Sequence, residues 1–159
     1  MKIFLTYILV FSSLVSSTMD NTKLVYQALA GDSLESLEKA LHELSKQKET
    51  SLIRAYQGAL IAKEAEYQKG VGDKVKSFKK GATMLEAEIE ANPEEVEYRF
   101  LRLAIQEQSP GILGYKDNME EDKKIIIDNY LSLKPALKKQ IALYAKKSSV
   151  ISSDDLPTK

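Results

Sequence analysis

Apolar residues recur along most of this chain at intervals of three and four, the spacing of one face of an α-helix. A clear run is Leu34, Leu37, Leu41 and Leu44. Glycine and proline interruptions divide the chain into segments of helical length, and no segment alternates with period two for long enough to predict a strand. We therefore expect an all-α fold of about seven helices, at residues 21–30, 33–47, 51–69, 74–91, 94–108, 118–131 and 134–147.

Helix starts are predicted from residues that can cap the free N–H groups of a first turn. Three pairs combine a short polar residue with a glutamate three positions later, the pattern of a capping box: Asp32 with Glu35, Asn92 with Glu95, and Asp117 with Glu120. Pro93 follows Asn92 and is expected at the first helical position, where its missing N–H costs nothing.

The third predicted helix has one face made only of small residues: Ala55, Gly58, Ala62 and Ala65. A glycine in mid-helix costs about 1 kcal/mol relative to alanine, so Gly58 needs a compensating reason. Close approach of a neighbouring helix is such a reason, and the fourth helix has its own mid-helix glycine, Gly81. Short turns between successive helices predict antiparallel hairpins.

These two helices also carry a family resemblance. The stretches "RAYQGALIAKEAEY" and "GATMLEAEIEANP" together resemble a tetratricopeptide-type hairpin. In this comparison Gly58 and Gly81 match small packing positions. Leu85 matches a large position, and Pro93 matches the terminating proline. The following "YRFLRLAI" is similar to the next first helix, so the resemblance spans residues 51–108. It implies helical hairpins arranged as an α-solenoid or an irregular bundle. The segment is also loosely similar to small exported bacterial proteins of unassigned function, which supplies no catalytic residue.

The fifth predicted helix combines cations with an otherwise apolar segment. At about 100° per residue, one arc about 60° wide holds the polar positions Glu95, Arg99, Arg102 and Gln106. Apolar residues fill most of the remaining circumference, so neighbours are expected on at least two sides, with a narrow polar slit between them. Glu97 lies within the apolar part. A buried carboxylate is costly without a partner, so we expect a cationic or hydroxyl group on a neighbouring helix.

Two hypotheses account for the arginines. In the first they are structural, with Arg99 paired to Glu95 one turn earlier. Glu86 or Glu90 of the preceding helix then receives the guanidinium groups. In the second, Arg99 and Arg102 hold a carboxylate or phosphate of a ligand or partner peptide. Acidic residues are abundant nearby, which favours the structural hypothesis.

Two further segments offer candidate surfaces. The loop "SPGILGY" carries Ile112, Leu113 and Tyr115, which are expected to fold back onto the core, with a partner-binding lip as the alternative. The segment "KPALKKQIALYAKK" is a basic amphipathic helix. We expect it to close the bundle with its apolar face, and the alternative is binding to a membrane surface.

Charge and composition narrow the classes of function. The chain has 23 Lys and Arg residues against 23 Asp and Glu residues, so there is no electrostatic basis for nucleic-acid binding. Cysteine is absent, which excludes disulfides, thiolate metal sites and cysteine nucleophiles. The single histidine, His42, makes neither a zinc site nor a catalytic triad. We expect no metal, no cofactor and no catalytic motif.

The N-terminal residues have the pattern of a signal peptide. Lys2 precedes an apolar run at residues 3–15, and small residues follow near Ser17. A spanning helix needs roughly 20 residues, so no permanent membrane anchor is expected after cleavage. The predicted organisation is a leader at residues 1–17, one helical domain at 18–147 and a flexible tail at 148–159. An exported chain without cysteine is typical of a bacterial periplasmic or secreted protein.

These observations predict a non-catalytic, exported helical module that binds or scaffolds a protein partner. The candidate binding residues are Glu97, Arg99, Arg102, Gln106 and Tyr115. The candidate packing residues are Gly58, Gly81, Leu85 and Pro93. One alternative is a carrier of a small anionic or amphipathic ligand in a slit lined by Arg99 and Arg102, and another is an enzyme that uses Glu97. The sequence leaves the oligomeric state open.

Overall fold

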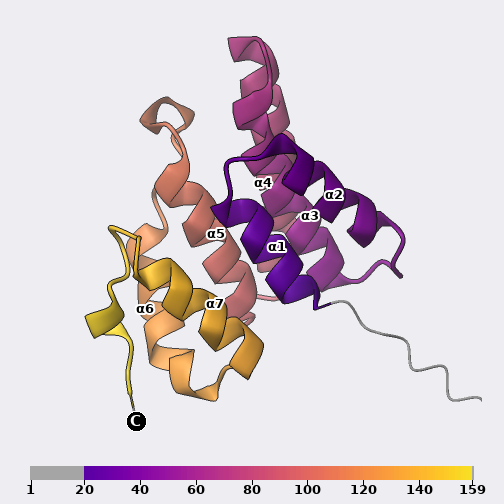
Figure 1. Ribbon diagram of the computed structural model, residues 1–159. Helices are drawn as coiled ribbons and strands as arrows, with labels where there is room; N and C mark the ends of the chain where they lie inside the picture. The colour runs from indigo at the N-terminus through magenta and orange to yellow at the C-terminus, as the bar shows by residue number, and fades with distance from the viewer. Residues whose placement is uncertain (1–19, 159) are drawn as a thin grey trace, which may run out of the picture.

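The computed structural model describes residues 20–158, and all regular structure within them is helical (Figure 1). The α-helices are α1 Asn21–Ala30, α2 Leu34–Ser45, α3 Ser51–Glu64, α4 Val71–Ala91, α5 Val96–Gln108, α6 Met119–Asn129 and α7 Pro135–Ala145. Short 3₁₀ turns are η1 Ala65–Tyr67, η2 Gly111–Leu113, η3 Tyr130–Ser132 and η4 Ser153–Asp155. The prediction of an all-α fold is confirmed. Among residues 20–158 no helix has both the length and the apolar character needed to cross a membrane. The predicted leader lies outside the described residues.

Helix starts differ from the predicted capping boxes. Ser33, rather than Asp32, caps α2, since its hydroxyl accepts a hydrogen bond from the Ser36 N–H at 3.3 Å. Asn118, rather than Asp117, directly precedes α6. Aspartate, asparagine and serine are caps of nearly equal strength. Two of them side by side therefore do not define which one starts the helix.

Asn92 closes α4 and does not open α5. Its side-chain amide donates to the Ser51 hydroxyl at 2.9 Å and to the Glu88 carbonyl at 3.1 Å. Because these bonds hold Asn92 against α3 and α4, Pro93 lies in the turn that follows, and α5 begins only at Val96. The prediction that Pro93 takes the first helical position is wrong.

Helices α3 and α4 pack with their backbones in near contact. A Cβ added at Gly58 would lie 2.8 Å from the Leu85 backbone nitrogen. A Cβ added at Gly81 would lie 2.3 Å from the Ala62 backbone nitrogen. Real Cβ atoms do not approach backbone this closely, so each position requires glycine. The two helices form a hairpin whose tip projects from one end of the molecule (Figure 1).

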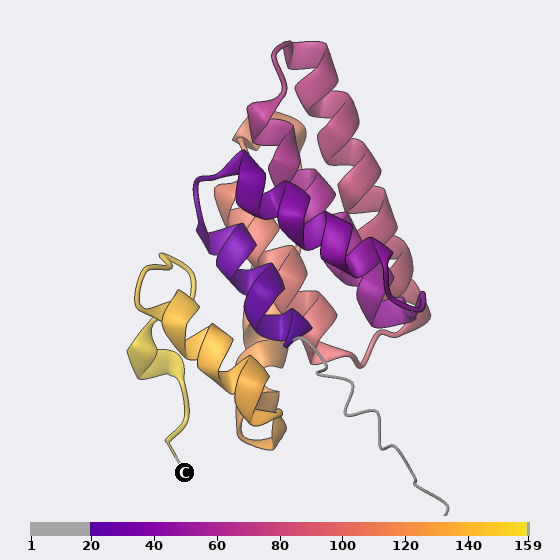
Figure 2. The same cartoon turned by 45° about the vertical axis from the view of Figure 1, so that its right-hand side comes forward.

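Contacts between the first and last α-helices close the fold. Helix α5 contacts α3, α4 and α6, and α1 packs against α2, α3 and α7 (Figures 1 and 2). Tyr26 of α1 stacks on Phe100 of α5 with ring centroids 5.0 Å apart. Phe100 in turn meets the edge of Tyr144 of α7 at 5.2 Å. Units of an open solenoid contact only their neighbours, so the described chain is an irregular helical bundle.

The segment after α7 differs from the expected flexible tail. Ile151 is 0% exposed and belongs to the core. The Ser149 N–H donates to the Glu107 carboxylate at 2.6 Å, and Lys123 pairs with Asp155 at 3.2 Å. The polar composition of the segment suggested fraying, but apolar packing and contacts of the Glu107 and Asp155 carboxylates hold it against α5 and α6. Val150 and Leu156 pack against the core beside Ile151.

Candidate functional site

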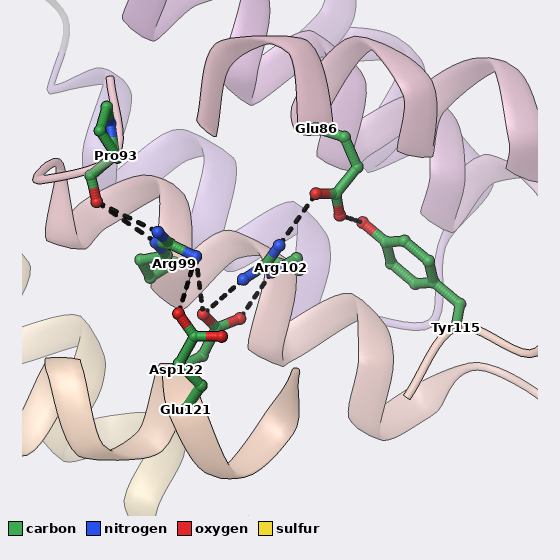
Figure 3. Close-up of polar contacts among 7 residues, drawn as sticks. All are labelled: Glu86, Pro93, Arg99, Arg102, Tyr115, Glu121 and Asp122. Atoms are coloured by element: carbon green, nitrogen blue, oxygen red, sulfur yellow. Dashed lines mark hydrogen bonds and ion pairs between the residues drawn. The ribbon is translucent and has the colours of Figure 1, made fainter. Parts of the chain in front are cut away.

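The polar face of α5 meets carboxylates from two neighbouring helices. Arg102 is only 4% exposed. Its Nε and Nη2 atoms donate to the two Asp122 carboxylate oxygens, each at 2.7 Å, and its Nη1 donates to Glu86 at 2.9 Å (Figure 3). Glu86 belongs to α4 and Asp122 to α6. Arg102 therefore joins α4, α5 and α6 through a bidentate ion pair with Asp122 and one further hydrogen bond to Glu86.

Arg99 completes the same cluster from one turn earlier. Its Nη1 atom lies 3.5 Å from the Asp122 carboxylate and 3.7 Å from that of Glu121. Its Nε and Nη2 atoms donate to the Pro93 carbonyl at 3.4 and 3.3 Å (Figure 3). The expected pair with Glu95 does not form among the described residues, because α5 begins after Glu95 and the guanidinium turns toward α6. We call Arg99, Arg102, Glu86, Glu121 and Asp122 the arginine network.

Asp122 and Glu121 are the two members that the sequence did not predict, and Asp122 is the buried one. It is 0% exposed, and burial raises the pKa of its carboxyl group above the ordinary value, while Arg102 and then Arg99 oppose that rise. The sequence led us to expect the guanidinium partners on the preceding helix, at Glu86 or Glu90. A signal was present, because Asp122 lies four residues before the fully buried Ile126 and so on the same helix face.

Tyr115 is attached to the network through Glu86. Its hydroxyl donates to the Glu86 carboxylate oxygen that Arg102 does not use. The Tyr115 ring meets Phe78 edge-on with centroids 5.3 Å apart. Tyr115 and Leu113 therefore pack against the core, as expected for their loop. Ile112 of the same loop does not, since it is 94% exposed.

Glu97 has the hydroxyl partner that its position required. The Tyr56 hydroxyl of α3 donates to the Glu97 carboxylate and also lies 3.2 Å from the Thr22 hydroxyl of α1. Burial raises the pKa of Glu97 above its ordinary value, and the Tyr56 hydrogen bond opposes that rise. Glu97 thus belongs to a separate polar contact between α1, α3 and α5.

Gln106, the fourth residue of the predicted arc, does not join the arginines. It is buried, and its side-chain oxygen has no hydrogen-bond partner among residues 20–158.

Within the same residues no group of three or more His, Cys, Asp or Glu side chains could hold a metal ion. Both guanidinium groups instead have protein oxygens as partners, and these bonds fasten α4, α5 and α6 together.

Two hollows lie away from the arginine network. The first, which we call the hairpin-tip cleft, has a volume of about 230 Å³ and lies between η1, the start of α4, the end of α5 and η2. The second, the α1–α7 groove, has a volume of about 530 Å³ and is lined by α1, α5, α7 and Ser148. None of Glu97, Arg99, Arg102, Gln106 and Tyr115 lines either hollow.

The hairpin-tip cleft is apolar and has exposed apolar rims. Val71 on the α4 side is 80% exposed and Ile112 on the η2 side is 94% exposed, whereas Phe78 and Ile105 line the interior and are buried. The tip of the α3–α4 hairpin and the loop after α5 lie at the same end of the molecule in both views (Figures 1 and 2). The sequence offered the loop as an alternative binding lip but gave no indication that α4 forms its other side.

The two lysines that line the cleft already have hydrogen-bond partners. The Lys63 ammonium donates to Glu66 at 2.9 Å and to the Gln108 side chain at 2.7 Å. The Lys74 ammonium donates to the Glu66 carbonyl at 3.0 Å. These bonds link η1 to the end of α3, the start of α4 and the end of α5, which are walls of the cleft.

Comparison of the chain with protein-family models, with curated proteins and with solved structures found no match. The class of protein is therefore defined by the described residues alone: an irregular all-α bundle with a buried arginine network and an apolar cleft at one end.

Proposed function

We propose that this protein is an exported, non-catalytic helical module that binds a protein partner through the hairpin-tip cleft. The observation that carries the proposal is the pair of exposed apolar side chains, Val71 and Ile112, on opposite rims of an apolar cleft. Monomeric proteins leave few contiguous apolar patches in contact with water, and such patches are typical of interaction sites. Export rests on the leader pattern of residues 1–17.

The size of the cleft favours a protein partner over a small molecule. Its volume of about 230 Å³ is below the range of roughly 300–1,000 Å³ typical of small-molecule pockets. It suits one or two apolar side chains of a partner, which act as anchors when they are buried at the centre of an interface. Val71 and Ile112 would then cover the anchor and exclude water around it.

Charge around the cleft favours an acidic partner surface. Residues 63–80, which form the hairpin tip, contain six lysines and three acidic residues. The lysines are Lys63, Lys69, Lys74, Lys76, Lys79 and Lys80. Complementary charge at the rim of an interface accelerates association and selects partners. We therefore propose a partner segment with an apolar anchor flanked by acidic residues.

The other functions predicted from the sequence have less support. A carrier that uses Arg99 and Arg102 would have to displace Asp122, Glu86 and Glu121 from the guanidinium groups. An enzyme that uses Glu97 would need space for a substrate beside it, and Glu97 lines neither hollow.

Site-specific photo-cross-linking in cells that express the full chain tests the proposal. A benzophenone amino acid placed at Ile112 or at Val71 should cross-link to the same protein. Placement at Leu131, which is 49% exposed and lines neither hollow, is the matched control and should give no such product. Equal products at all three positions, or none at any of them, would argue against a partner at the cleft.

A further inference from the structure

We propose that the α1–α7 groove binds a single amphipathic molecule with an alkyl tail and a carboxylate or similar anionic head. This site is distinct from the hairpin-tip cleft and does not rest on the function proposed for it. At about 530 Å³, the groove falls within the range of roughly 300–1,000 Å³ that holds small-molecule ligands.

Aromatic and small side chains give the groove preformed apolar walls. Tyr26, Phe100 and Tyr144 all line it and hold one another through the stacked and edge contacts described above. Ala30 and Ala104 also line it, and their small side chains leave depth between the helices. On α5 the lining runs from Phe100 to Gln108. At 1.5 Å per residue this is a length of about 12 Å, which favours an elongated tail.

Polar and charged residues gather where the three helices end. Gln108 is the last residue of α5, and Lys146 and Lys147 directly follow α7. Glu107 also lines this end, but Tyr144, Ser148 and Ser149 all donate hydrogen bonds to its carboxylate. These bonds lower the pKa of Glu107 although burial acts to raise it, so it is ionised and already satisfied.

The two lysines supply the charge that selects the head group. Both are exposed, and neither ammonium forms an ion pair with a carboxylate of residues 20–158. A ligand with an apolar tail along the aromatic wall would present its head to Lys146 and Lys147. An anionic head group there would be attracted by two full positive charges, each carried on a long and flexible side chain.

Helix dipoles act in the opposite sense. The C-terminal end of a helix carries about half of a negative elementary charge, and this effect fades within one turn. The ends of α1, α5 and α7 therefore favour a cationic head, as does the carboxylate of Glu107. The proposal requires the attraction of the two ammonium groups for an anion to exceed the repulsion from the helix C-termini and from Glu107. An alkyl anion and an alkyl cation of equal length separate the two possibilities.

Titration of the full chain with sodium dodecanoate, below its micelle concentration, tests the proposal by calorimetry and tyrosine fluorescence. We expect one molecule to bind per chain, and dodecyltrimethylammonium to bind at least about tenfold more weakly. The double charge reversal K146E/K147E should weaken dodecanoate binding by about tenfold or more. The matched control K79E/K80E reverses an adjacent, exposed lysine pair that lines neither hollow, and it should leave the affinity unchanged.

A second variant tests the position of the tail. Ala30→Phe places a ring at an exposed position of the groove wall, so it should weaken dodecanoate binding without lowering the melting temperature.

Four outcomes would overturn the proposal: no saturable dodecanoate binding, tighter or equal binding of the cation, equal losses in the two lysine double variants, or binding only to anionic phospholipid vesicles. Ile112→Asp should leave dodecanoate binding intact, which keeps this test separate from that of the partner site.

Discussion

At Arg102, the cost of burying a cation is offset by three hydrogen bonds to two carboxylates. Removing one partner of such a cluster lowers the stability of the fold by more than the net contribution of the ion pair, because the other charge remains buried without its partner. Without Arg102, the buried Asp122 carboxylate would keep only Arg99, at 3.5 Å, as a cationic partner.

Arg102→Ala should therefore lower the free energy of unfolding by about 3 kcal/mol. Arg102→Lys should recover only part of the loss, because an ammonium cannot make the two-pronged pair with Asp122. Urea denaturation measures both values. If Arg102→Ala unfolds at the wild-type midpoint and has lost a stabilisation by added phosphate or acetate, the arginines serve a ligand and the structural interpretation is wrong.

Glu97→Gln should stabilise the protein at neutral pH. Burial raises the pKa of Glu97 in the folded state, so the unfolded chain loses its proton first as the pH rises. The folded state therefore loses stability as the pH rises from the ordinary glutamate pKa, about 4.3, through the raised folded value. Glutamine keeps the oxygen that accepts from Tyr56 but carries no charge.

We expect the free energies of unfolding of Glu97→Gln and wild type to agree near pH 4 and to diverge in favour of the variant by about pH 7. Urea denaturation at both pH values gives the comparison. Glu38→Gln on the exposed side of α2 is the control and should gain nothing as the pH rises. A variant less stable than wild type at neutral pH would show that the charge of Glu97 is needed by the fold.

At the scale of elements, the sequence predicted the helices well and their ends poorly. Apolar spacing identified each α-helix, because every one buries a face at that spacing. Helix ends depend on single hydrogen bonds, such as those that keep Asn92 with α4, and several adjacent residues could have made them. The partner of Arg102 on α6 and the packing of Ile151 depend on which helices meet in three dimensions, which apolar spacing along the chain does not specify.

The close α3–α4 contact predicts that alanine, normally the better helix former, is worse than glycine at position 58. Gly58→Ala should destabilise the protein by about 1–3 kcal/mol, because the added Cβ would meet backbone. Gly72→Ala is the matched control on α4, where a Cβ meets nothing within 4 Å. That change should stabilise by up to about 1 kcal/mol through helix propensity. Thermal unfolding of the two variants distinguishes them, and a melting temperature for Gly58→Ala that is unchanged or raised would rule out backbone contact at Gly58.

The C-terminal segment should contribute to stability through Ile151. Because this side chain is fully buried, Ile151→Ala should cost about 2–5 kcal/mol. Leu131→Ala removes a comparable side chain from an exposed position and should have little effect. Chemical denaturation provides the measurement, and an unchanged midpoint for Ile151→Ala would restore the expectation of a frayed tail.

For the whole molecule, the arginine network is separate from the two hollows that we propose as binding surfaces. The arginine network joins α4, α5 and α6 and lines neither hollow. The hairpin-tip cleft and the α1–α7 groove both use residues from the C-terminal half of α5, and Gln108 lines both. The candidate residues taken from the sequence were the most unusual ones chemically. The hollows combine ordinary apolar residues with surface polar ones, and only the fold brings these together.

The central claim is that Ile112 serves binding and not folding. The most direct test is the affinity of the cross-linked partner for Ile112→Asp, measured by calorimetry beside urea denaturation of the same variant. We expect affinity to fall at least about tenfold, with the free energy of unfolding within about 0.5 kcal/mol of wild type because Ile112 is 94% exposed. Leu131→Asp should change neither quantity. Unchanged affinity in a stably folded Ile112→Asp protein would contradict the proposed site.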